Sequence, residues 1–136
     1  MTHLLLLPGI FIHELSHLIM GFLLNAKPVN FSIIPNKKDK SAGHVVFKNI
    51  TFYNALPVGI APTIIGPGLL YIFWQEYLSF LVSEYGMISQ VIFYYLAITI
   101  IYCCAPSSQD IKVIFKNPLS ILLYGTISYV IYKTIT

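Results

Sequence analysis

The chain has 136 residues, of which 57% are hydrophobic and only 10% are charged. Together with its long apolar runs, this composition excludes an ordinary soluble domain and indicates an integral membrane protein. All the cationic side chains apart from histidine are lysines, and the net charge of +3 is too small for the dense basic stripe that nucleic-acid binding requires. The length allows one domain of a few membrane spans, so we treat residues 1–136 as a single unit.

The first apolar run, from about Leu4 to Leu24, is long enough to cross a hydrocarbon core of about 30 Å. It contains the pattern H-E-x-x-H, formed by His13, Glu14 and His17. On a helix the two histidines lie one turn apart on the same face, where their imidazoles can bind one Zn²⁺ at about 2.0–2.1 Å. Glu14 follows the first histidine, a position from which a carboxylate can take a proton from water at the metal.

A pattern this short also arises by chance, and histidines can be core residues whose hydrogen bonds are satisfied. Here, however, the chain has few histidines and glutamates, and three of them, His13, Glu14 and His17, fall within one helical turn. That turn lies within an apolar segment. Ionisable groups at such depth are costly and usually functional, which favours a metal site. Pro8 either kinks this span or marks the true start of its helix.

The main polar loop, residues 25–53, separates the first apolar run from the second. Partial alternation over residues 29–34 and 43–47, with turn-forming residues between them, predicts a β-hairpin or two short strands. His44 lies in the second segment. It is either an exposed hairpin residue or a further metal ligand or proton carrier.

Three later apolar runs, residues 56–74, 87–104 and 118–132, complete the expected fold. We therefore predict an all-α membrane protein with about four transmembrane helices and a small β-hairpin between the first and second. The second run is rich in Pro and Gly, which indicates either broken backbone lining a cavity or a kinked span with small residues for helix packing. Cys103 and Cys104 are expected to be reduced, buried and structural.

The lysines predict the topology. The segments 25–53 and 105–117 hold seven of the eight lysines, whereas segment 75–86 holds none and carries Glu76 and Glu84. The positive-inside rule then places the first two segments in the cytoplasm and both termini outside. We expect a multi-pass protein of the cell membrane, without a removable signal peptide, whose active site faces the cytoplasmic side.

Catalytic zinc usually has three protein ligands and one open position. Asp39 lies among lysines, and Glu76 and Glu84 belong to the opposite side of the membrane, so elimination leaves Asp110 as the third ligand, with His44 as the runner-up. Asp110 can also be a simple helix-capping residue, because Pro106 and Ser107 are typical of a helix start.

This ligand set predicts metal-assisted hydrolysis, with Zn²⁺ as cofactor and Glu14 as the general base. A site inside the membrane implies a membrane-embedded or membrane-anchored peptide or protein as substrate. The hairpin at residues 29–47 could bind such a peptide in extended form by strand addition.

The same residues resemble the site-2 protease family of intramembrane zinc metalloproteases. The resemblance covers the motif at residues 13–17, then Gly21, the strand-like residues 29–34, the Gly/Pro-rich residues 61–68 and a later aspartate. It implies that His13 and His17 are zinc ligands, that Glu14 is the base and that membrane-anchored peptides are cleaved in regulated proteolysis. The chain differs from the family in having Gln-Asp-Ile around Asp110 instead of Leu-Asp-Gly, which indicates a small, divergent relative.

A second hypothesis is a non-proteolytic membrane protein, either a metal-binding scaffold or an immunity-type protein that retains the zinc-binding core. Such a protein needs no carboxylate beside its first ligand, and here Glu14 is present. An ion transporter would require charged groups along several spans, and the later spans have almost none. The sequence names neither the natural substrate nor the oligomeric state.

Overall fold

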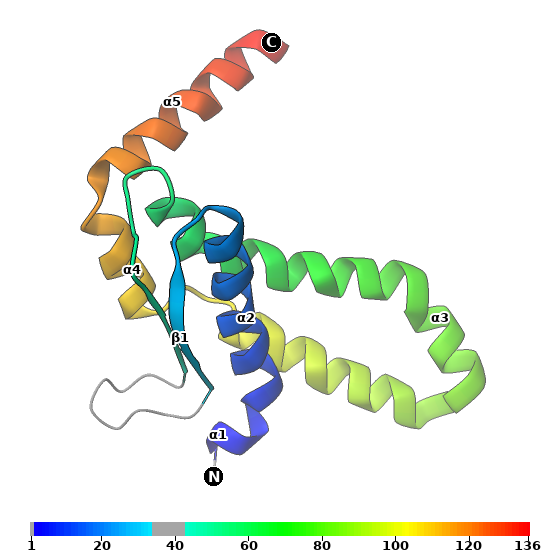
Figure 1. The fold of residues 1–136 in the computed structure, drawn as a ribbon. Coiled ribbons are helices and arrows are strands. Elements are labelled where there is room, and N and C mark those ends of the chain that lie inside the picture. Colours follow the sequence, from blue (N-terminus) through cyan, green and yellow to red (C-terminus); the bar gives the residue numbers. More distant parts are fainter. Residues whose placement is uncertain (1, 34–42) are drawn as a thin grey trace.

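The computed structural model describes the backbone of residues 2–33 and 43–136, and the side chains of residues 4–33, 43–75, 80, 83 and 85–136. The expected turn at residues 35–42, with Asp39, lies outside the described residues. The described part is mostly helical and includes one small antiparallel sheet, as predicted (Figure 1). Its elements are α1 (Thr2–Leu5), α2 (Leu7–Leu23), β1 (Pro28–Ser32), β2 (His44–Phe47), α3 (Ala55–Cys103), α4 (Ser108–Phe115) and α5 (Pro118–Ile135).

The helix that carries the motif, α2, is shorter than the span expected from Leu4 to Leu24. The helix breaks at Leu6, and α2 begins at Leu7 with Pro8 in its first turn, where the missing N–H of proline is tolerated. Its end is a Schellman motif. Asn25 adopts a positive φ of 54°, and the N–H of Ala26 donates to the carbonyl of Gly21 at 2.8 Å. Pro8 therefore marks a helix start rather than a kink.

The two strands form the predicted hairpin, with Phe31 opposite Val45 and Ser32 opposite His44. The hairpin packs on α2 through two glycines. Gly21 of α2 touches the ring of Phe47, and Gly43 touches the side chain of Glu14. A side chain at either glycine would push the sheet away from the helix. The hairpin is therefore held directly over the motif.

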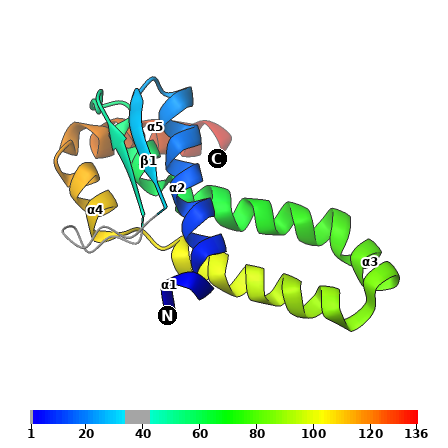
Figure 2. The same ribbon diagram turned by 60° about the horizontal axis from the view of Figure 1, so that its bottom comes forward.

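Helix α3 folds back on itself and forms two arms, Ala55–Gln75 and Tyr85–Cys103 (Figures 1 and 2). The expected loop over residues 75–86 is wrong, because the backbone stays helical through that segment and leaves helical geometry only at Gly86, with φ 63° and ψ −145°. Glycine lacks the Cβ that disfavours this conformation. Across the two arms, the rings of Phe73 and Phe93 stack with centroids 5.8 Å apart.

The Pro- and Gly-rich first arm is a continuous helix that includes Pro62 and Pro67. Two of its three glycines serve packing: Gly59 contacts Ile114 of α4, and Gly66 contacts Cys104, whereas nothing lies close to Gly68. Small residues thus allow close approach of neighbouring elements, which is the packing interpretation of this segment. Cys103 and Cys104 are free, as expected. Cys104 is buried as predicted, whereas Cys103, also expected to be buried, is only half-buried.

Two helices in the described part of the chain are long and apolar enough to cross a membrane, and they are the two arms of α3. They match the second and third predicted spans. Helix α2, with 17 residues, falls short, and α4 and α5 meet at a bend of 83°, so that they count as one broken span at most. The structure therefore supports two spans, or three with the bent pair, and does not confirm four.

The packing of α2 against α3 generates a stability prediction. A methyl group at Gly9 would overlap the backbone carbonyl of Thr99. We expect Gly9→Ala to destabilise the fold by about 1–3 kcal/mol, the usual range for overpacking, and to lower the thermal midpoint in detergent measured by circular dichroism. Gly125→Ala is the control, because no atom lies within 4 Å of the added methyl group. Equal midpoints for the two variants would contradict this packing.

Candidate metal centre

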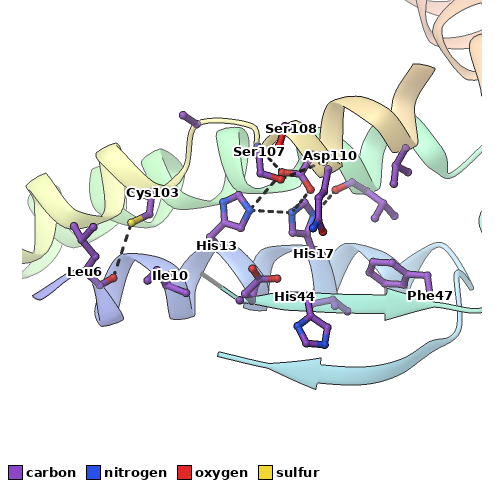
Figure 3. Close-up of a pocket in the computed structure, with 18 of the residues that line it drawn as sticks. Leu6, Ile10, His13, His17, His44, Phe47, Cys103, Ser107, Ser108 and Asp110 are labelled. Carbon is purple, nitrogen blue, oxygen red and sulfur yellow. Dashed lines mark hydrogen bonds and ion pairs between the residues drawn. The ribbon is translucent and has the colours of Figure 1, made fainter. Parts of the chain in front are cut away.

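The side chains of His13 and His17 are both buried and lie one turn apart on the same face of α2, as the motif predicts. Their rings are perpendicular, with centroids 4.8 Å apart, and the two Nε2 atoms lie 3.2 Å from each other (Figure 3). Both Nε2 atoms thus reach the same point between α2 and α4. A helical spacing of four residues is sufficient to produce this pair.

Asp110 of α4 completes the group. Its Oδ1 lies 3.0 Å from Nε2 of His17, and its Oδ2 lies 3.5 Å from Nε2 of His13. One ligand atom from each of the three residues lies within 4.8 Å of the other two. His13, His17 and Asp110 therefore lie close enough together to bind one metal ion.

The orientation of His17 is fixed by the backbone of α3. Its Nδ1 lies 2.7 Å from the carbonyl oxygen of Val58, and a carbonyl can only accept, so Nδ1 carries the hydrogen and donates it. In the neutral ring, Nε2 then presents a lone pair toward His13 and Asp110. A carbonyl that orients a histidine in this way is the usual support of a metal ligand.

The donor set fits a zinc ion. In the neutral tautomer, lone pairs of His17 and Asp110 face each other across 3.0 Å, which is unfavourable unless a metal ion lies between them or His17 takes up a proton. His13 adds a second imidazole, whose buried Nδ1 has no hydrogen-bond partner. Two imidazole nitrogens and one carboxylate form a typical catalytic zinc site with a position left open.

Asp110 is held by the local structure of α4. Ser107 caps this helix: its Oγ accepts a hydrogen bond from the N–H of Asp110 at 3.2 Å, and Oδ2 of Asp110 accepts one from the N–H of Ser107 at 2.7 Å. The predicted helix start at Pro106 and Ser107 is confirmed. The carboxylate of Asp110 therefore fills both roles considered for it: it takes part in the cap of α4, and it lies beside the two histidines.

Glu14 is buried and lines the same cavity as the three residues. It interacts electrostatically with both histidines of the motif, with Asp110 and with His44. Gly43 lies so close that a Cβ there would come within 2.8 Å of Oε1 of Glu14. The glycine thus leaves the space in which this carboxylate lies, a role that nothing in the sequence indicated.

His44 also lines the cavity, from strand β2. Its Nδ1 is buried without a hydrogen-bond partner, so it is not simply an exposed hairpin residue. Among the described residues, however, His44 does not belong to the group whose ligand atoms converge. The geometry therefore places Asp110, and not the runner-up His44, beside the two imidazoles.

The cavity has a volume of about 310 Å³. One wall is α2, a second is the hairpin from Gly43 to Phe47, and a third is the segment from Cys103 to Asp110. Val58 and Gly59 close the cavity on the α3 side. The Gly/Pro-rich segment therefore lines a cavity, as one of the two interpretations of its sequence predicts. The space is large enough for a short stretch of peptide.

Comparison with known proteins gives no match to a family model, to a curated protein or to a solved structure. The resemblance to site-2 proteases rests on the residues of this chain alone.

Ser107 should affect metal binding because it holds Asp110 in place. We expect Ser107→Ala to weaken zinc binding about tenfold, the lower end of the usual effect of removing an outer hydrogen bond from a metal ligand, measured by competition with a chromophoric chelator. Ser107→Thr should restore binding, since threonine also caps helices.

The neighbouring variant Ser108→Ala serves as the control, because Ser108 lies next to the cap on the cavity wall but is not the capping residue. Equal zinc affinity in Ser107→Ala and Ser108→Ala would show that the cap does not position the carboxylate.

Proposed function

We propose that this chain is a membrane-associated zinc peptidase that hydrolyses peptide bonds of membrane-embedded or membrane-anchored substrates. One observation carries the proposal: His13, His17 and Asp110 converge within 4.8 Å, and Glu14 lines the same cavity without belonging to that group. A site that only stored a metal would have no need of this fourth ionisable residue. The combination is the minimum that metal-assisted hydrolysis requires.

His13, His17 and Asp110 would hold the ion, with His17 oriented by the carbonyl of Val58 and Asp110 by Ser107. A zinc ion bound there supplies a Lewis acid and makes water acidic enough to act as a nucleophile near neutral pH. The apolar side chains Leu6, Ile10 and Val113 line the same cavity and lower its polarity. Charge interactions inside such a cavity are stronger than in bulk water.

Glu14 moves the proton. Its carboxylate accepts a proton from the attacking water, the water oxygen forms a bond to the peptide carbon, and the C–N bond breaks as Glu14 returns the proton to the departing amine. The products are one carboxylic acid and one amine, and Glu14 is again ionised.

The substrate would enter beside β2, because Gly43, His44 and Val45 form one wall of the cavity. An extended peptide is the form that can offer its carbonyl there, since a helical peptide has its carbonyls occupied by hydrogen bonds. Pairing with a strand edge is a common way to hold a peptide extended. The non-proteolytic alternative, a metal-binding scaffold, would use the same three ligands and leave Glu14 idle.

The decisive variants separate metal binding from hydrolysis. We expect the purified protein to contain zinc by mass spectrometry and to cleave a lipid-reconstituted, quenched fluorogenic peptide that carries an apolar anchor helix. Glu14→Gln should keep zinc and lose about 10²–10⁴ in rate, the usual contribution of a general base. Glu76→Gln makes the same chemical change in the segment between the two arms and should leave both properties unchanged.

Removal of a ligand should do the reverse. Asp110→Ala and His17→Ala should both lose zinc, because each removes one of three converging donors. Zinc content equal to that of the wild type in Asp110→Ala would remove Asp110 from the site. Full hydrolysis by Glu14→Gln would overturn the mechanism, and zinc binding without hydrolysis of any anchored peptide would favour the scaffold.

A further inference from the structure

The candidate metal site lies at one end of the two arms of α3. The carbonyl that orients His17 belongs to Val58, in the first turns of the first arm, which begins at Ala55. Asp110 lies on α4, which follows shortly after the second arm ends at Cys103. The site is thus attached where the first arm begins and where the second arm ends. We call this shared end the base of the two α3 arms.

Helix α2 lies across this base. Just before α2 begins, the hydroxyl of Tyr95 donates to the carbonyl of Leu5, the last residue of α1, at 2.6 Å. In its first turn α2 meets the second arm, where Gly9 touches Thr99. Near its end it meets the start of the first arm, where Nδ2 of Asn54 donates to the carbonyl of Leu24 at 3.3 Å. Figures 1 and 2 both show α2 crossing the two arms instead of running alongside them.

The outward face of α2 is an apolar stripe. At 100° per residue, the positions of α2 opposite His13 and His17 are those of Phe11, Leu15, Leu18, Ile19 and Phe22. Phe22 is 73% exposed, Phe11 42% and Ile19 40%, whereas Leu15 and Leu18 are half-buried. The helix therefore buries its ionisable residues and exposes its hydrophobic ones, which is the reverse of a surface helix in water.

This apolar stripe faces the side toward which the arms project. Both figures place α4 and the β-hairpin (β1 and β2) on one side of α2, while the arms of α3 extend away on the other. His13 and His17 point toward Asp110 of α4. The opposite face, with the apolar stripe, therefore turns away from α4, and in both figures the arms extend on that side of α2.

The arms fit a bilayer. They have 21 and 19 residues, which at 1.5 Å per residue gives lengths of about 31 and 28 Å, against a hydrocarbon core of about 30 Å. Neither arm contains a charged residue, and the segment that joins them carries Glu76 and Glu84. The elements at the base carry the exposed lysines Lys27, Lys48, Lys112 and Lys116.

We propose that the two arms of α3 cross the bilayer, whereas α2 lies in the plane of the cytoplasmic surface with its apolar stripe against the acyl chains. The lysines at the base fix that surface as the cytoplasmic one. The cavity then opens at the level of the lipid headgroups, and not within the hydrocarbon. If the proposed function holds, on which this last step rests, the substrate is a peptide segment next to the membrane surface, where water reaches the site without crossing lipid.

The depth of α2 can be measured in vesicles of brominated phosphatidylcholines, whose bromine atoms quench tryptophan at known depths. The background is Trp74→Phe, which removes the single tryptophan. Phe11→Trp and Phe22→Trp probe two points of the apolar stripe that lie about 16 Å apart along the helix. Ile64→Trp, at an exposed position midway along the first arm, is the control for a deep site.

For α2 in the plane, bromines nearest the headgroups should quench both Phe11→Trp and Phe22→Trp most strongly, and bromines near the chain ends should quench Ile64→Trp. A spanning α2 would instead give two clearly different depths, and that result would overturn the proposal. Ile19→Trp, also exposed on α2, replaces either variant should it fail to fold. No step of this measurement uses hydrolysis, so it stands even if the proposed function fails.

The substrate class has its own test. The same cleavable sequence is placed either just after an anchor helix or at the centre of that helix, and both peptides are reconstituted with the wild-type protein. We expect at least tenfold faster cleavage of the first peptide. Faster cleavage at the helix centre, with α2 still shallow, would refute the substrate class and leave the placement of α2 intact.

Discussion

The imidazole of His17 connects three parts of the molecule. Its Nδ1 donates to the carbonyl of Val58 in α3, and its Nε2 faces Asp110 of α4, while the residue itself belongs to α2. Burying a polar group costs free energy unless another polar group meets it. These contacts therefore favour the arrangement of the three helices in which the partners of His17 coincide, since loss of one partner leaves a buried polar group unmatched.

The short helix α4 shows how little structure is needed to place the third residue. It has 8 residues, and its capping box uses the same carboxylate that faces the histidines. The N–H of Ser107 occupies Oδ2, which leaves Oδ1 as the atom nearest to His17. Local capping thus restrains the rotamer of Asp110. The cap also restrains the short non-helical connection between Cys103 and α4. Without such a restraint, ordering this connection would cost more conformational entropy.

Sequence reasoning found the parts of the site that have a local signature. The pair His13 and His17 follows from helical spacing, and the hairpin follows from alternation between turn-forming residues. Asp110 was reached only by elimination, yet it lies beside the pair. The carbonyl of Val58 and the space beside Gly43 were missed because backbone groups and absent side chains leave no chemical signature in a single sequence.

The two wrong predictions about the fold, the loop over residues 75–86 and the first span, have a common physical origin. Segment 75–86 was expected to be a loop because it carries Glu76 and Glu84, but it contains no proline, and only Gly86 leaves helical geometry. Charge predicts contact with water and does not by itself end a helix. Similarly, the apolar run before residue 24 gives the length of a possible span and says nothing about its direction.

Direction depends on contacts: α2 meets the second arm near its start, where Gly9 touches Thr99, and the first arm in its second half, where His17 meets Val58. A helix so attached can follow the axis of neither arm. This geometry also suits a reaction that consumes water. A hydrolytic site deep in hydrocarbon needs a polar channel to the surface, and each polar wall of that channel must be satisfied by protein. In the proposed placement no such channel would be needed, because the serines and the glutamine of the segment that bounds the cavity, Ser107, Ser108 and Gln109, are exposed. Two spanning arms with the site at their polar end would then make a larger helical bundle that carries water inward unnecessary.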